Sequence, residues 1–236
     1  MSEPKDKFSK DDFKNIIFSD NTKIRKQFQD AFTTEINDFI EAIFNAYEAQ
    51  ELLDKKCRND KQKTYTAGFL FNAIKNLVGS FSLLISGYMV PSGNLMRHSA
   101  ESLAMALLTS NKSLNYFERL QSDLKKGKNF PVHKSLKYVL KHAHVLKIDS
   151  KKWSQFIDLF KFYDNYSHAS LLSLSDIFDF ARSGDFSIGP NYDSDSKKQE
   201  IYRIEINHRI NMANFLKNVI KKQFLNKEFD IKVPKT

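Results

Sequence analysis

Residues that interrupt helices are scarce in this sequence. It contains only seven glycines and five prolines in 236 residues, and its apolar residues recur every three or four positions instead of alternating. That period matches the α-helix, in which such positions share one face, whereas a half-buried strand repeats every two residues. Few glycines and prolines also leave few places at which a helix must stop. The sequence therefore predicts an all-α protein.

Polar segments divide the helical periodicity into about seven main helices around long antiparallel ones. The longest is expected over 23–54, and a more evenly apolar one, the expected centre of the bundle, over 65–89. Pro91 disfavours helix at the residue before it, so the chain is expected to break at 90–94. The other main helices are expected at 95–110, 114–125, 132–146, 150–168 and 198–225, and a short additional helix is expected at 11–18.

These helices predict one domain. We expect a charged leader with a short helix at 1–22, a single helical bundle at 23–227 and a frayed tail at 228–236. A long irregular loop, 169–196, precedes the last helix, and its segment 186–188 has the character of a short strand. Loops of this length inside a compact domain tend to be functional or to cover something.

Composition excludes several classes of protein. The hydrophobic content of 41%, with 21 phenylalanines, is enough for a sizeable core. The single cysteine, Cys57, excludes an intrachain disulfide framework and a multi-cysteine zinc site, and without an obvious activating base it is expected to be a free thiol. The charged N-terminus does not resemble a secretory signal, and the longest weakly polar run, 77–90, is shorter than the roughly 20 residues of a membrane span. We expect a cytoplasmic protein without a membrane partner.

The positive charge is concentrated in one segment. Lysine and arginine exceed aspartate and glutamate by 37 to 28, and residues 120–152 hold nine lysines against two aspartates. Lys134, Lys137 and Lys141 lie on a different face of the 132–146 helix from its apolar stripe. Such a cluster is typical of a surface that binds RNA or another polyanion, and these three lysines are candidate substrate-binding residues. The alternative is a solvated basic face without a partner.

The last helix carries the most chemically suggestive cluster, Arg203, Glu205, His208 and Arg209. In the functional interpretation, His208 acts as general base, taking the proton of a ribose 2′-hydroxyl, or as general acid, while Arg203 holds the phosphate; this suffices for RNA cleavage without metal. Arg209 is a further candidate for substrate binding. In the structural interpretation, Arg209 pairs with Glu205 four residues before it, and the histidine is a surface or packing residue.

Two more polar groups are candidates. Asp164 precedes His168 by four residues, so on a continuous helix the carboxylate can orient the imidazole, and both are candidate catalytic residues. The alternative is a histidine that joins the helix end to the following loop. Arg97 precedes Glu101 by four residues, a pair that forms either a structural network or the wall of a site in which Arg97 binds substrate.

A metal site and a cofactor are not expected. The spacing of Glu205 and His208 matches half of a di-iron carboxylate pattern, but the second half is missing. His142 and His144 would point to different faces of a helix. The sequence also contains no glycine-rich phosphate loop and no GxSxG, HExxH or CxxC motif.

Three motifs in chain order resemble those of a known family. They are GNLMRHSAE at 93–101, YDNYSH at 163–168 and, after a loop with glycines and aspartates, YRIE at 202–205. Together they resemble uncharacterised bacterial helical proteins related to the HEPN superfamily, over about residues 65–225.

The resemblance implies a helical bundle, often a homodimer, and in many members a metal-independent ribonuclease of a bacterial toxin or antiviral system. Those members use an R-x(4–6)-H motif near the start of a late helix, and Arg203 and His208 match it. Ile204 departs from the pattern, because active members usually carry a polar residue after the arginine. Non-catalytic members serve as RNA-binding or dimerisation modules. We therefore expect an RNA-binding, HEPN-like protein with endoribonuclease activity in bacterial defence, or alternatively a non-catalytic interaction module whose polar clusters are structural.

Overall fold

The computed structural model describes residues 9–57, 59–128, 130–164, 178–179, 185–186 and 189–226. Most of them are helical, which confirms the all-α bundle. The elements are α1 (Lys10–Phe18), α2 (Thr22–Ala31), α3 (Thr33–Cys57), α4 (Lys61–Leu84), α5 (Met89–Ser110), η1 (Lys112–Leu114), α6 (Tyr116–Lys125), η2 (Val132–Lys134), α7 (Ser135–Lys141), α8 (Ala143–Leu146), α9 (Ser150–Asp164), β1 (Phe178–Asp179), β2 (Asp185–Phe186), α11 (Ser196–Val219) and η4 (Ile220–Leu225), a π-helical continuation of α11.

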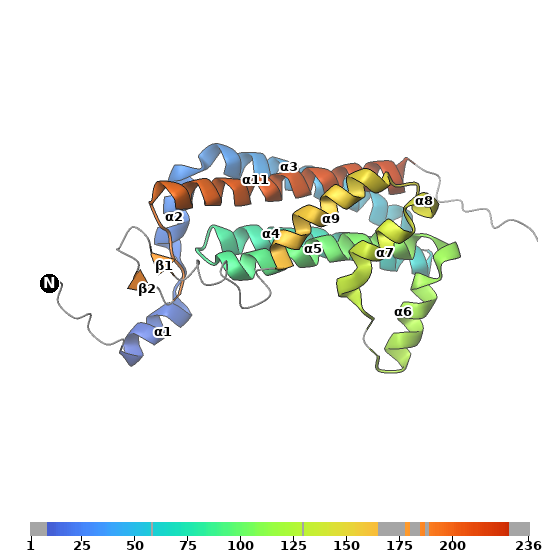
Figure 1. Ribbon diagram of the computed structural model, residues 1–236, viewed down its shortest axis with the longest axis horizontal. Coiled ribbons are helices and arrows are strands. Elements are labelled where there is room, and N and C mark those ends of the chain that lie inside the picture. Colours follow the sequence, from blue (N-terminus) through green and yellow to red (C-terminus); the bar gives the residue numbers. More distant parts are fainter. Residues whose placement is uncertain are drawn as a thin grey trace, which may run out of the picture.

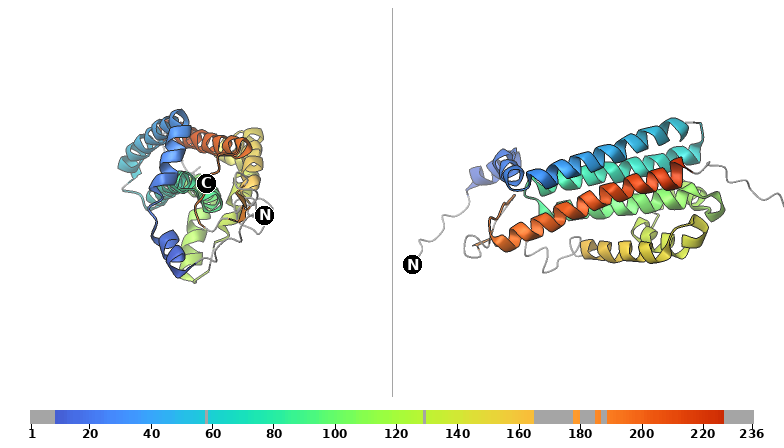
Figure 2. Two further views of the ribbon diagram at one scale, coloured as in Figure 1. Left: turned by 90° about the vertical axis from the view of Figure 1, so that its left-hand side faces the viewer. Right: turned by 90° about the horizontal axis from the view of Figure 1, so that it is seen from above.

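Four long helices form the body of the molecule. In Figure 1, α3, α4, α5 and α11 all run along the long axis, and the end-on view in Figure 2 shows them grouped around a common centre. The most extensive contacts join α4 to α5 and α11 to α3, and α4 also contacts α3 and α11. The expected bundle of long helices is therefore present, with α4 and α5 at its centre.

Shorter helices cover one side and both ends of this body. Helix α9 packs on α5 and α7, and α6, α7 and α8 gather at one end of the bundle. Helices α1 and α2 lie at the opposite end, near β1 and β2 (Figure 1). As a result, the lysine-rich segment and the start of α11 lie at opposite ends of the long axis.

The central helices are buried because their inward positions are apolar or small. Ala73, Ala100 and Ala104 are fully buried, and such small side chains let α4 and α5 approach closely. Between α3 and α4, the rings of Phe39 and Phe81 stack with centroids 3.9 Å apart. Helix α4 is also long and apolar enough to cross a membrane by length and composition. Ten of its residues are buried in the bundle, so its apolar face belongs to the core.

The expected helix at 23–54 is two helices that meet at a bend at Phe32, whose backbone leaves the helical region with φ −130° and ψ 33°. Both Phe28 and Phe32 are buried, and each contacts the ring of Tyr202 on α11. Phe28 also packs edge-on against Tyr192. Because of the bend, both phenylalanines contact this aromatic cluster while α3 still runs along the bundle.

The break between the central helices lies at residues 85–88, not at the expected 90–94. Gly87 adopts φ +83°, and a Cβ at this position would lie 2.6 Å from the backbone nitrogen of Asn191. Pro91 instead occupies the first turn of α5, where its missing N–H leaves no helical hydrogen bond unmade. The next helix thus starts at Met89, six residues earlier than expected, and includes the motif that carries Arg97.

The other segments follow the expected order with local differences. The helix expected at 132–146 is divided into η2, α7 and α8. In the region expected to be irregular, β1 and β2 pair antiparallel, so Phe186 is in a strand while 187–188 lie outside the described residues. The single-domain boundaries remain a prediction. Residues 1–8 of the leader and the whole tail, 228–236, lie outside the described part of the chain.

Candidate functional site

Arg209 is the centre of a buried polar network between α4, α5 and α11. Its side chain has no solvent exposure, and its Nη1 donates to the Oε2 of Glu205 at 2.7 Å and to the Glu205 carbonyl at 2.6 Å. Its Nε and Nη2 donate to the hydroxyls of Ser80 at 2.9 Å and Ser92 at 2.6 Å. All three guanidinium nitrogens therefore donate to groups inside the fold.

The two serines are oriented to accept these bonds. The Ser80 hydroxyl donates to the Ser92 carbonyl at 2.7 Å, and the Ser92 hydroxyl donates to the Ser80 carbonyl at 2.6 Å. Because each hydroxyl has one proton and gives it to the opposite backbone, its oxygen lone pairs remain for the Arg209 guanidinium. The network thus links α4 to α5 and holds a buried positive charge between them.

Tyr163 extends the network to α9. Its buried hydroxyl lies 3.1 Å from the Glu205 Oε2 and 3.0 Å from the Nδ1 of His208. A carboxylate that pairs with arginine only accepts hydrogen bonds, so the single tyrosine proton goes to Glu205 and the phenol oxygen accepts from the imidazole. His208 therefore carries its proton on Nδ1, which leaves a lone pair on Nε2.

The two ring systems have shifted protonation equilibria. Burial raises the pKa of Tyr163 far above its usual value, with the Glu205 carboxylate acting in the same direction. Burial lowers the pKa of the partly buried His208, the Arg209 charge adds to that effect, and Glu205 opposes it. His208 is therefore a neutral imidazole at pH 7, and Tyr163 stays protonated.

A second polar cluster lies beside this network, where α9 ends on α5. Arg97 pairs with Glu101 at 3.0 Å and with Asp164 at 3.3 Å, and the Nδ1 of His98 lies 3.5 Å from the other Glu101 oxygen. Glu101 is nearly buried while Asp164 is half exposed. Because Tyr163 and Asp164 are consecutive, the last turn of α9 connects both clusters. The expected partner of Asp164, His168, lies outside the described residues.

Arg203 and His208 are not brought together in the described contacts. The Arg203 side chain is 54% exposed, pairs with Glu35 of α3 at 3.0 Å and lies over the ring of Phe32 at 5.6 Å. His208 contacts α9 instead. Residues five apart on a helix are separated by about 140°, so this divergence follows from helical geometry. The assignment of Arg203 and His208 to one catalytic pair stays a prediction, and in this structure the two side chains contact different helices.

Substrate binding by Arg209 also stays a prediction, although the side chain is buried in this structure. The ordinary Glu205–Arg209 pair that the sequence offered as the alternative is present, but inside the core instead of on the surface. All three guanidinium nitrogens of Arg209 donate to buried groups, so this side chain stabilises the fold. Arg97, in contrast, is 21% exposed and keeps one edge at the surface.

All nine lysines of the 120–152 segment are exposed. They extend from the end of α6 across α7 and α8 to the start of α9, at one end of the molecule (Figure 1). Among the described residues, none of them is within ion-pair distance of a carboxylate. We call this set the lysine face: Lys125, Lys126, Lys128, Lys134, Lys137, Lys141, Lys147, Lys151 and Lys152.

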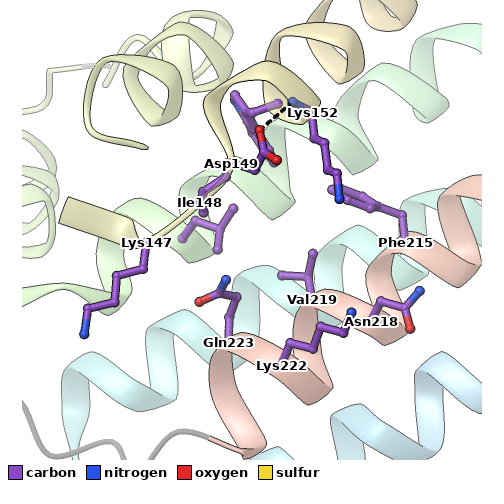
Figure 3. A pocket seen from close by; sticks show the side chains of 11 residues that line it. Lys147, Ile148, Asp149, Lys152, Phe215, Asn218, Val219, Lys222 and Gln223 are labelled. Carbon is purple, nitrogen blue, oxygen red and sulfur yellow. Dashed lines mark hydrogen bonds between the residues drawn. The ribbon is translucent and has the colours of Figure 1, made fainter. Parts of the chain in front are cut away.

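A cavity of about 320 Å³ opens beside the lysine face, between the start of α9 and the end of α11. Figure 3 shows it with Lys152 on one side and Lys222 on the other. Its apolar wall includes Trp153 and Phe215. Sequence reasoning missed this cavity because its lining comes from α5, the α8–α9 connection, α9 and the α11–η4 helix, which only the tertiary fold brings together.

The described residues offer no obvious metal site. No group of three or more histidine, cysteine, aspartate or glutamate side chains in this part of the chain is arranged to hold an ion. Cys57 is a free, buried thiol, and burial raises its pKa, so it has little thiolate character at neutral pH.

No protein-family model matches this chain. Comparisons with curated proteins and with solved structures also give no match. The resemblance to the HEPN superfamily therefore rests on the motifs at 93–101, 163–168 and 202–205 alone.

Proposed function

We propose that this protein binds RNA through the lysine face. The observation that carries the proposal is the exposure of nine lysines in one region, none with a carboxylate partner among the described residues. Uncompensated like charges hold counterions at the surface, and a phosphate backbone that replaces those counterions binds with a gain in their entropy. The resemblance to HEPN proteins, many of which act on RNA, supports RNA over other polyanions.

The binding proposal is tested with labelled single-stranded and hairpin RNA over a range of salt concentrations. Lys134→Glu with Lys141→Glu is expected to weaken binding and to lower the steepness of its salt dependence by about 0.7–0.9 logarithmic units per lost phosphate contact. The matched control is Lys10→Glu with Lys14→Glu on α1, at the other end of the molecule, which changes the net charge equally (Figure 1). Equal losses in both double variants, or unchanged affinity in the first, would remove the lysine face as the binding surface.

A second candidate function is metal-independent RNA cleavage with His208 as the general base. The observation that favours it is the hydrogen-bonded chain from Glu205 through Tyr163 to His208, which leaves the Nε2 lone pair available on a neutral ring. Such a lone pair can accept the proton of a ribose 2′-hydroxyl. In this proposal, Arg203 does not hold the reacting phosphate, because its contacts lie toward α3.

Cleavage is tested on labelled RNA with and without EDTA. His208→Ala is expected to abolish EDTA-resistant cleavage, whereas Asn207→Ala, at the exposed neighbouring position, and Arg203→Ala are expected to retain it. Absence of cleavage by the unmodified protein under all conditions would rule out His208 as a base and leave a non-catalytic binding module. The same resemblance supports a homodimer in a bacterial defence or toxin system, and light scattering of the purified protein measures its oligomeric state.

A further inference from the structure

The cavity between α9 and α11 has a rigid aromatic wall. Trp153 is almost fully buried, and its indole N–H donates to the Leu136 carbonyl at 2.9 Å, which holds the ring in place. Phe215 packs beside it, with the ring centroids 6.3 Å apart and the planes tilted by 38°. Phe156 contacts both rings and supports them from behind. A flat apolar group that enters the cavity gains dispersion contacts with surfaces that are already ordered.

The mouth of the cavity is positively charged. Lys152 extends from α9 toward α11, and Lys222 comes from the facing turn of η4, so the two ammonium groups border the same opening (Figure 3). Within the described chain, neither lysine is in ion-pair range of a carboxylate. Asp149 also lines the cavity, but its Oδ1 accepts from the backbone N–H groups of Lys151 and Lys152 and so caps α9. The lysines therefore remain available to an anion from solution.

Two amides complete the lining. Asn218 of α11 and Gln223 of η4 also line the cavity (Figure 3). An amide offers both donors and an acceptor, which is the combination needed to bind the edge of a heterocyclic base or a ribose hydroxyl. A volume of about 320 Å³ lies at the lower end of the range for small-molecule sites, enough for one such unit.

We propose that this cavity binds one nucleoside monophosphate unit. The base lies against Trp153 and Phe215, and the phosphate lies between Lys152 and Lys222. The same chemistry has two sources, a nucleotide of a bound RNA strand or a free mononucleotide. Lys152 belongs to the lysine face, so a strand on that face passes the mouth of the cavity. The RNA source rests on the proposed function, whereas the mononucleotide source does not.

The protein carries its own reporter for this test. Trp153 is the only tryptophan in the chain and lines the cavity, so its fluorescence responds to a base that stacks beside it. Adenosine 5′-monophosphate is expected to quench this fluorescence to saturation. Adenosine alone and inorganic phosphate alone are expected to bind more weakly, because each makes only part of the contacts. A short oligoadenylate tests the RNA source.

Lysines outside the cavity and the lysine face provide matched controls. Lys152→Glu with Lys222→Glu is expected to weaken binding of the monophosphate at least about tenfold, since two charge-assisted contacts are lost. Lys14→Glu with Lys221→Glu makes the same change in net charge at exposed positions outside both the cavity and the lysine face, and is expected to retain most of the affinity. Asn218→Phe blocks the mouth without altering charge and is also expected to abolish quenching.

The outcomes separate this proposal from the function proposed above. Saturable quenching by both ligands supports the RNA source, and quenching by the monophosphate without any RNA binding supports the free nucleotide and overturns the RNA-binding proposal. RNA binding that depends on Lys134 and Lys141 with no Trp153 response to either ligand overturns the cavity proposal alone. Equal losses in the two lysine double variants also overturn it, because they reflect general attraction instead of a defined site.

Discussion

Replacement of Arg209 by methionine tests whether the buried network holds the bundle together. Methionine keeps much of the volume but removes the arginine that pairs with the Glu205 carboxylate at 2.7 Å. The buried carboxylate then keeps its charge and still accepts a hydrogen bond from the Tyr163 hydroxyl at 3.1 Å. Loss of one member of a buried ion pair costs about 3–5 kcal/mol. Ser80 and Ser92 keep their mutual bonds to backbone carbonyls and add little to that cost. We therefore expect a loss near the low end, about 3 kcal/mol.

Urea unfolding followed by circular dichroism measures this loss, and a thermal melt is expected to shift down by about 2–4 °C per kcal/mol for a chain of this size. The control is Arg203→Met on the same helix, whose exposed pair with Glu35 is worth about 0–1 kcal/mol. Arg209→Met combined with Glu205→Met leaves no unpaired charge and is expected to be less destabilised than Arg209→Met alone. A loss in Arg209→Met no larger than in Arg203→Met would refute the argument.

Three further predictions concern other parts of the fold. Gly87→Ala is expected to destabilise the protein more than Gly127→Ala in urea unfolding, because both glycines have positive φ but only at Gly87 does a Cβ meet backbone atoms; equal losses would contradict the close approach. Stability is expected to fall as the pH drops below about 6.5, because burial lowers the pKa of His208 and the unfolded chain therefore takes up the proton first. His208→Gln should weaken this pH dependence of stability. The part that remains is due to His142, whose pKa is also lowered by burial. Cys57 is expected to react with a thiol reagent only after unfolding, and fast reaction of the folded protein would contradict its burial.

Periodicity predicted that the helices exist but not where they bend. Phe28 and Phe32 fall on one apolar stripe, so the sequence favours a continuous helix through them. The bend arises from a tertiary cluster with Tyr192 and Tyr202, about 170 positions later in the chain, and no local sequence pattern predicts this contact. At the second break, the proline was the stronger local signal, but Gly87 was the residue that the turn required.

For the candidate site, the sequence predicted which residues are exposed but not which residues on different helices contact each other. The exposure of Lys134, Lys137 and Lys141 followed from their position off the apolar stripe, and the structure confirms it. The partner of His208 is Tyr163, 45 residues earlier, and this contact depends on how α9 packs beside α11. Side chains from separate elements meet only when the bundle forms, so spacing within one helix selected Arg203 as the partner in place of a residue on another helix.

The burial of Arg209, in contrast, follows from its position on the buried stripe of its own helix. One stripe of the continuous α11–η4 helix is buried along its length: Tyr202, Ile206, Arg209, Ala213, Leu216 and Ile220. Arg209 occupies a core position in this stripe, whereas Arg203 does not. A charged side chain at a core position must be paired, and Glu205, one turn earlier, is buried and supplies the pair. The carboxylate that neutralises Arg209 also accepts the Tyr163 hydroxyl, which orients His208. The group that stabilises the bundle therefore also sets the tautomer of the imidazole, so a variant of Glu205 changes stability and the state of His208 together.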